Sequence, residues 1–235
     1  ELGDMSFFNE MLQLLENNPV SITQNFQKIQ EMMDTESFID YQIANLFVGN
    51  TDWPGNNYRI WRKKIAFNPD AQKGLDGRWR WMMFDTDFAF NIYYGADVNF
   101  NMFQFATATN GPGWPNPPHS TFLFRTLLTN TSFKNDFINR YNDLLNTSFS
   151  VARTSTVIDS IVGIIQPEMD KHIQRWSSPG TIQDWNWEVD RIRNFTNART
   201  SIVRDQLQQF FNFPGYFNLK VKNPNIDAGT VFVNR

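Results

Sequence analysis

Two stretches of the sequence decide the fold: NTDWPGNNYRIWR at residues 50–62 and RWRWMMFDTD at residues 78–87. The first opens with turn-forming residues and then alternates apolar and polar side chains, which is typical of a half-buried strand. The second also alternates, follows an Asp-Gly turn pair, and runs directly into Asp85 and Asp87. We therefore predict an antiparallel β-hairpin whose second strand leads into two carboxylates.

Helical spacing of apolar residues surrounds the hairpin on both sides. Before it, the pattern predicts helices over residues 5–17, 22–33 and 35–48, with Ser21 as an N-cap and Gly49 as the left-handed end of the third helix. After it, a loop rich in Asn, Gly and Pro over residues 91–118 precedes further helices. These are predicted at residues 121–128, 132–146, 151–165, 167–176 and 181–211, with Pro167 in a first turn and a possible break in the last helix.

The expected fold class is therefore α+β and mostly α, with a β-hairpin between two groups of helices. Beyond residue 212 the pattern changes, and residues 216–221 and 231–233 predict two short strands. We expect one region over residues 1–212, followed at 213–235 by a linker and the start of a truncated β segment.

Composition excludes several classes of function. The 235 residues carry 21 Lys and Arg against 24 Asp and Glu, so the net charge of −3 argues against nucleic-acid binding. The absence of cysteine excludes cysteine nucleophiles and thiolate metal sites. No apolar stretch reaches the roughly 18–20 residues of a membrane span, so none is predicted.

Common catalytic motifs are also missing. His119 and His172 lack metal-ligand partners at suitable spacing, so both are interpreted as structural. The sequence has no nucleophile elbow, P-loop or dinucleotide-binding glycine motif. A calcium loop starting at Asp85 is excluded because Phe90 and Ala96 occupy the positions that need Gly and Glu.

What remains is an ordered set of polar residues. A helix leads to Asp52, Asn57 follows five positions later, and Asp85 comes after the hairpin. Protein kinases use this order, with one carboxylate to orient the attacking hydroxyl and an amide and a second carboxylate to hold metal ions. Because the chain contains 27 Asn residues, the spacing alone favours the interpretation of Asp52 and Asn57 as two turn residues.

Longer motifs resemble the CotH (spore coat protein H) kinase family of atypical protein kinases. They are residues 50–58 and 81–87, supported by residues 132–141 and 167–176, so that the resemblance spans about residues 35–212. It implies a protein-kinase-like C-terminal lobe with Asp52 as catalytic base, Asn57 and Asp85 as ligands of the metal and its nucleotide, and Asp87 as a further metal ligand. Phe84 stands where the family has Trp.

The resemblance further implies Mg²⁺ and ATP as cofactors, a secreted or surface protein with Ser or Thr as the acceptor, and an extracellular or cell-surface location. The nucleotide lobe of a kinase would lie before residue 1, so we expect this chain alone to transfer phosphate poorly. We also expect metal to bind weakly without phosphate, because Mg²⁺ usually takes part of its shell from substrate. The oligomeric state is left open.

Two other functions remain as alternatives. One is a non-catalytic module that binds glycan or protein through aromatic residues of the loop, namely Phe100, Phe103, Phe105 and Trp114. Core packing is the favoured explanation for these four aromatics. The other is a glycosidase with paired carboxylates, which depends on their separation in space.

Overall fold

Helix α3 (Thr35–Val48) runs through the centre of the computed structural model, which describes residues 3–92, 96–217, 219–222 and 229. The Asp34 carboxylate caps its first turn by accepting from the Ser37 amide at 3.1 Å, and Gly49 ends it in a left-handed conformation at φ 69°. Ile43 and Leu46 are fully buried. Helices α4 (Met102–Ala106), α6 (Thr131–Asn146) and α8 (Ile182–Phe211) and strand β2 (Arg80–Met82) pack against α3, so buried side chains surround it.

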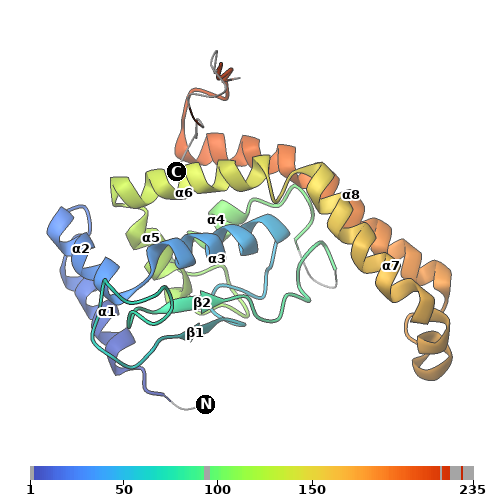
Figure 1. Ribbon diagram of the computed structural model, residues 1–235, viewed down its shortest axis with the longest axis horizontal. Coiled ribbons are helices and arrows are strands. Elements are labelled where there is room, and N and C mark those ends of the chain that lie inside the picture. The colour runs from blue at the N-terminus through green and yellow to red at the C-terminus, as the bar shows by residue number, and fades with distance from the viewer. Residues whose placement is uncertain (1–2, 93–95, 218, 223–228, 230–235) are drawn as a thin grey trace.

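Elements on either side build the body around α3 (Figure 1). In chain order they are α1 (Ser6–Asn17), α2 (Thr23–Met32), α3, β1 (Arg59–Trp61), β2 (Arg80–Met82), α4 (Met102–Ala106), the 3₁₀ turn η1 (Pro118–Thr121), α5 (Phe122–Leu127), α6 (Thr131–Asn146), α7 (Val151–Trp176) and α8 (Ile182–Phe211). The fold is mostly helical with one two-stranded sheet, as predicted.

The predicted hairpin is present but short. β1 and β2 pair antiparallel, with Arg59 opposite Met82 and Trp61 opposite Arg80. The buried Arg80 guanidinium lies 2.9 Å from Asp34 and 2.7 Å from Asp76, so the hairpin is fastened to the carboxylate that caps α3. This ion network places the start of β2 beside the start of α3.

Several helix predictions need correction. Residues 151–176 form one helix with Pro167 inside it, and α8 is continuous over 30 residues. Ile22 rather than Ser21 occupies the N-cap of α2, and the predicted loop contains the short helix α4, which Asn101 caps. Strands of three residues replace the longer predicted ones.

The region after α8 also differs from expectation. No strand forms over residues 213–217 and 219–222, so the strand predicted at residues 216–221 is wrong in this described part. The strand predicted at residues 231–233 lies outside the described residues.

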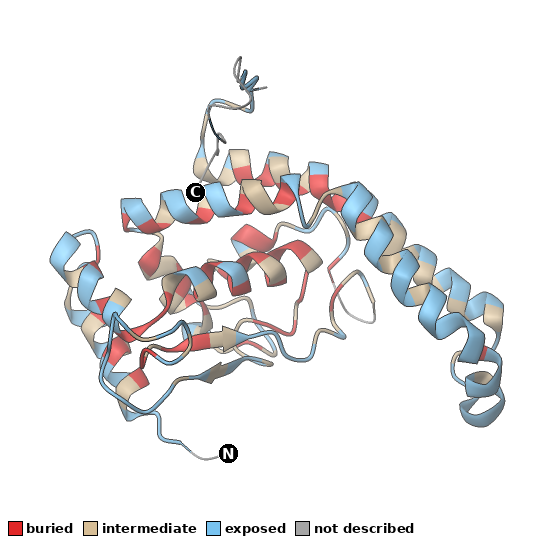
Figure 2. Ribbon diagram, viewed as in Figure 1, coloured by how far each residue is buried: buried red, intermediate tan, exposed pale blue. Residues whose placement is uncertain are grey.

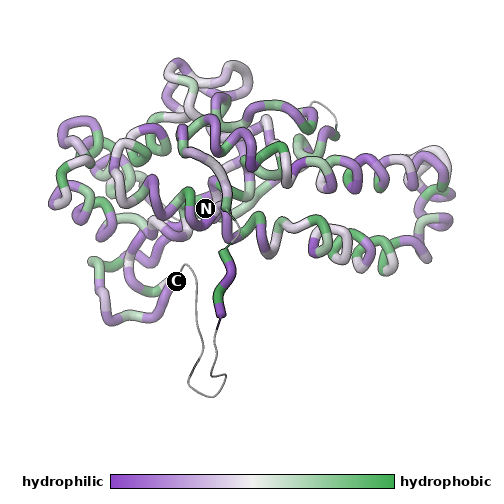
Figure 3. The backbone as a smooth tube through the Cα atoms, turned by 90° about the horizontal axis from the view of Figure 1, so that it is seen from above, coloured by the Kyte–Doolittle hydropathy of each residue, from purple (hydrophilic) through white to green (hydrophobic). Residues whose placement is uncertain are grey.

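The paired helices α7 and α8 leave the body as an arm (Figure 1). Burial is concentrated in the body, whereas the arm is mostly exposed (Figure 2), and Met169 is the buried residue of α7. Apolar and polar residues alternate along the arm (Figure 3). Within the described residues no single helix is long and apolar enough to cross a membrane, but α6 and α7, bent by 62° at their junction, meet those criteria as a pair.

Candidate functional site

The loop after α3 is tied to the helix by a chain of asparagine bonds. The fully buried Asn50 donates through Nδ2 to Oδ1 of Asn45 at 3.0 Å. Its own Oδ1 accepts from the backbone N–H of Asp52 at 3.1 Å. The C-terminal part of α3 therefore fixes the backbone position of Asp52 in the loop that follows.

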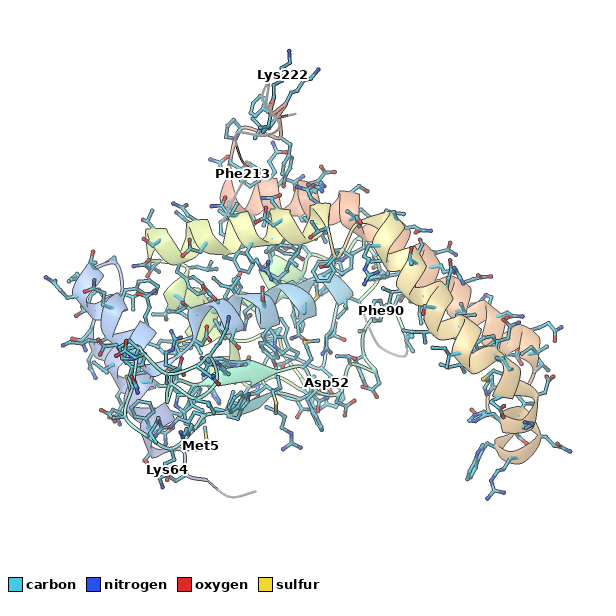
Figure 4. The ribbon with its side chains drawn as sticks, viewed as in Figure 1. Met5, Asp52, Lys64, Phe90, Phe213 and Lys222 are labelled. Carbon is cyan, nitrogen blue, oxygen red and sulfur yellow. The ribbon has the colours of Figure 1, made fainter. Side chains whose placement is uncertain are left out.

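Asp52 is 9 % exposed and lies near the open end of the hairpin, beyond the last residue of β2 (Figure 4). Asn56 Nδ2 donates to its Oδ1 at 2.9 Å, and Asn57 Nδ2 donates to its Oδ2 at 2.5 Å. The five-residue spacing predicted from the sequence thus brings Asp52 and Asn57 into direct contact. Each carboxylate oxygen has a second lone pair, so both can still accept a bond from another group.

Two further anchors hold this loop. Trp53 is fully buried and meets the ring of Tyr41 edge-on, with the centroids 6.3 Å apart. Asn116 accepts from the Gly55 amide at 2.7 Å and donates to the Thr51 carbonyl at 3.2 Å. Asn116 was missed by sequence reasoning because it belongs to a distant Gly- and Pro-rich loop, where Asn reads as a turn residue.

Asp85 follows the hairpin, as predicted, but it is not part of a strand. β2 ends at Met82, and Asp85 has a left-handed backbone at φ 50°. In a regular strand, alternation would direct Asp85 and Asp87 to one face, and this argument does not apply to a segment that lies outside the strand. Asn57 is also left-handed, at φ 47°, and Asn and Asp tolerate this conformation better than most residues.

The carboxylates of Asp85, Asp87 and Asp52 nonetheless interact electrostatically. The pKa of Asp85 is raised above its ordinary value, chiefly by a hydrogen bond with Asp87 and further by the negative charges of Asp87 and Asp52. The two predicted acidic positions are therefore close enough to repel each other, and Asp52 contributes to the same negative potential.

The polar side chains of Asp52, Asn57, Asp85 and Asp87 offer only oxygen ligands to a cation. Carboxylate and amide oxygens are the ligands that Mg²⁺ and Ca²⁺ prefer. No group of three or more His, Cys, Asp or Glu side chains in the described part of the chain converges as a metal cluster.

A cation of the protein itself also lies beside this acidic region. The Arg59 guanidinium stacks over the Phe84 ring, 4.3 Å from its centroid, and Phe84 immediately precedes Asp85. Sequence reasoning treated Arg59 as a polar strand position. Strand pairing places Arg59 opposite Met82, the last residue of β2. A predicted register for the hairpin would therefore have placed Arg59 near the segment that contains Asp85.

The remaining candidates have different roles. His172 bonds the Ser178 carbonyl at 2.8 Å, in agreement with a structural histidine. Among the loop aromatics proposed for surface binding, Phe103 is buried and stacks on Phe210, whereas Trp114 is 87 % exposed.

Comparison with known proteins gives a family. The family model described as CotH kinase protein matches residues 2–203. The match therefore includes α1 and α2, which lie before the span of about 35–212 over which the sequence motifs show the resemblance. No curated protein and no solved structure matches the chain significantly. Because the family match covers most of the sequence, the chain belongs to the CotH kinase protein family.

Proposed function

We propose that this chain carries the catalytic centre of a protein kinase that transfers the γ-phosphate of ATP to a Ser or Thr hydroxyl. The proposal includes a kinase-like C-terminal lobe, and assigns Asp52 as the base and Asn57, Asp85 and Asp87 as metal ligands. The observation that carries it is the contact between Asp52 and Asn57 together with the electrostatic coupling of Asp52, Asp85 and Asp87. Membership of a kinase family supports the general chemistry.

Asp52 is suited to orient an acceptor hydroxyl. Two amide donors fix the plane of its carboxylate, and one lone pair on each oxygen remains for a substrate O–H. In the proposed reaction, the acceptor hydroxyl would donate to Asp52 and transfer its proton to a carboxylate oxygen of Asp52. The hydroxyl oxygen would form the new bond to the γ-phosphorus of ATP while the bond from that phosphorus to the bridging oxygen breaks and ADP leaves. The fixed carboxylate therefore supplies orientation and a proton acceptor.

Asn57 is suited to a second task because its two amide ends face different ways. A carboxylate oxygen can only accept, so the NH₂ group of Asn57 must face Asp52. Its carbonyl Oδ1 is then directed away from Asp52 and is a candidate metal ligand. Bound Mg²⁺ and ATP would supply the phosphoryl group and neutralise the charge that develops on it.

Activity assays of matched variants test the proposal. The chain, together with any longer natural form of it, is incubated with Mg²⁺, labelled ATP and a Ser/Thr-rich acceptor protein, and phosphate incorporation is measured. We expect Asp52→Ala and Asp85→Ala to lose at least about 100-fold in turnover. Asp70→Ala, in an exposed part of the hairpin loop, is the matched control.

Thermal unfolding of the same variants separates loss of function from loss of fold. Unchanged turnover in either active-site variant would remove that residue from the mechanism. If neither the chain nor a longer form binds ATP in a magnesium-dependent manner, the kinase proposal fails and the non-catalytic binding module replaces it.

A further inference from the structure

The backbone that follows Asp87 is bonded to the loop that leads to Asp52. The N–H of Thr51 donates to the Phe88 carbonyl at 3.3 Å. Thr51 directly precedes Asp52 in the chain, and Phe88 directly follows Asp87. This one bond therefore joins the neighbours of two proposed site residues, and the separation of their segments depends on it.

The next two residues, Phe90 and Asn91, form a turn with an unusual backbone. Their φ angles are 57° and 60°, which lie in the left-handed region. A bulky residue such as phenylalanine rarely adopts this conformation, and it persists only where the surrounding structure holds it. One such hold is the bond from the Phe90 N–H to the Val48 carbonyl, at the end of α3, at 2.8 Å.

Helix α8 supplies the side chains that complete the hold on this turn. Phe195 is 4 % exposed, and its ring meets the Phe90 ring edge-on, with the centroids 5.8 Å apart. Arg191, four positions earlier and so on the same face of α8, donates to the Asn91 carbonyl. Phe90 accordingly lies between the Asp52 loop and the base of the arm (Figure 4).

Phe195 also contacts the end of α3. A Cβ atom at Gly49 would lie 3.3 Å from Phe195 Cζ, so the tip of the ring lies against the Gly49 backbone. Gly49 begins the loop that reaches Asp52. Phe195 therefore lies between the turn that follows Asp87 and the loop that precedes Asp52, and it contacts both.

The acidic segment, residues 85–87, needs such a hold. The negative charges of Asp87 and Asp52 both act on Asp85. Like charges at this proximity repel each other, so contacts outside the three carboxylates must keep their segments together. Magnesium also demands near-ideal octahedral geometry, so a small shift of the acidic segment would weaken a complex that includes it.

We propose that Phe195 is a positioning residue of the site, which holds the acidic segment at the place beside Asp52 that a magnesium-bound nucleotide requires. This inference rests on the proposed kinase function. Phe195 acts through the turn at Phe90. Loss of the Phe195 ring lets this turn relax and moves the acidic segment away from Asp52, which weakens the magnesium-dependent binding of ATP.

Magnesium-dependent binding of a fluorescent ATP derivative, followed by polarisation, tests this role without catalysis. Magnesium is titrated at a fixed nucleotide concentration on the wild type and on Phe195→Leu, which stays apolar but removes the ring contact. We expect Phe195→Leu to need roughly tenfold more magnesium for half saturation. Loss of folded protein alone would reduce the amplitude of the signal without moving this midpoint.

Two further variants show whether the effect comes from this contact. Phe90→Leu removes the same ring contact from the other side, so the double variant with Phe195→Leu should be shifted no further than either single variant. Because Phe90 is only half-buried, Phe90→Leu also tests the contact if Phe195→Leu does not fold. Phe210→Leu, on the same helix, removes a ring that stacks on Phe103 at 5.4 Å and should leave the midpoint unchanged.

Hydrogen exchange measures the positioning directly and without nucleotide. The amides of Thr51 and Phe90 join the two segments. Both should exchange faster in Phe195→Leu than in the wild type, whereas the amides of residues 157–176 in the arm should not change.

The outcomes separate this inference from the proposed function. A wild-type midpoint in Phe195→Leu, or wild-type exchange at Thr51 and Phe90, would overturn the positioning role and leave the proposed function intact. An equal shift in Phe210→Leu would overturn it as well. If the wild type shows no magnesium-dependent binding of ATP, the proposed function fails and the positioning role fails with it.

Discussion

Asn57 Nδ2 lies 2.5 Å from Asp52 Oδ2, so the two residues assigned to catalysis and metal binding are directly coupled. Hydrogen bonds to a charged acceptor are stronger than neutral ones, and Asp52 is largely buried. We therefore expect a measurable interaction energy in a double-mutant cycle of Asp52→Ala and Asn57→Ala. The double variant should be less destabilised than the sum of the singles by about 1–3 kcal/mol, as measured by urea unfolding.

Asn56→Ala is the matched control for this cycle, because Asn56 is exposed and bonds the other oxygen of Asp52 at 2.9 Å. Its coupling to Asp52 should be smaller. Single-variant effects of Asp52 and Asn57 that add to within about 0.5 kcal/mol would show that the contact has no energetic role.

Gly55 permits close contact between the Asp52 loop and the segment that contains Pro117 and Ser120. A Cβ atom at Gly55 would lie 2.4 Å from Pro117 Cδ and 2.8 Å from Ser120 Cβ, and the Pro117 ring cannot rotate away. We expect Gly55→Ala to lower the free energy of unfolding by about 1–3 kcal/mol through overpacking. Gly163→Ala, inside α7 with no atom within 4 Å, should instead raise it by roughly 0.5–1 kcal/mol. Chemical denaturation of both variants checks the prediction, and equal shifts would contradict it.

Local signals in the sequence were sufficient for much of the fold. Gly49 correctly marked the end of α3, and alternation around residues 58–62 and 78–84 located the hairpin. The Pro167 prediction failed because a proline signal is local, whereas α7 packs along α8 and continues through it. Helix α4 was missed because five residues are too few to show helical periodicity.

The sequence predicted the order of the candidate site residues along the chain, but not the residues that hold their loop in place. The spacing of Asp52 and Asn57 was visible, and their contact follows from the turn between them. The asparagines that hold the loop could not be distinguished among the 27 asparagines of the chain, because Asn116 bonds the Thr51 carbonyl across 65 positions. Long-range bonds of this sort leave no periodic signal in one sequence.

Acid should weaken the ion network that fastens the hairpin to α3. Hydrogen bonds from Arg80, with further bonds from Arg78, hold the pKa of the buried Asp76 far below its ordinary value of 3.8. Since the folded-state pKa is depressed, Asp76 contributes stability that is fully present above the unfolded pKa and is lost as the pH falls toward the folded one. The stability advantage of wild type over Asp76→Asn should therefore be constant near neutrality and shrink progressively below about pH 4.

Thermal or urea unfolding of the two proteins between pH 7 and pH 2.5 measures this difference. Asp70→Asn, at an exposed position in the same loop, is the control and should show a much smaller change across this range. A gap between wild type and Asp76→Asn that stays constant down to pH 2.5 would mean that Asp76 is not the group that responds.

Arg199 on α8 supports the end of α3 from the opposite side of the Asp52 loop. It is fully buried, and it donates to the carbonyls of Leu46, Phe47, Val98 and Phe100 at 2.7–3.1 Å. Burial lowers the pKa of Arg199, but a guanidinium remains charged, and the carbonyls at the C-terminus of α3 favour a cation. Arg199→Met would leave these buried carbonyls without their donors, so we expect a loss of at least about 3 kcal/mol in unfolding free energy.

Arg193→Met, on the same helix but ion-paired at the surface with Asp159, should cost less than about 1 kcal/mol. Hydrogen exchange of the amides of residues 45–52 adds a local measurement: if Arg199 fixes the end of α3, exchange there should accelerate more than in the exposed arm, and a uniform acceleration would show only global destabilisation.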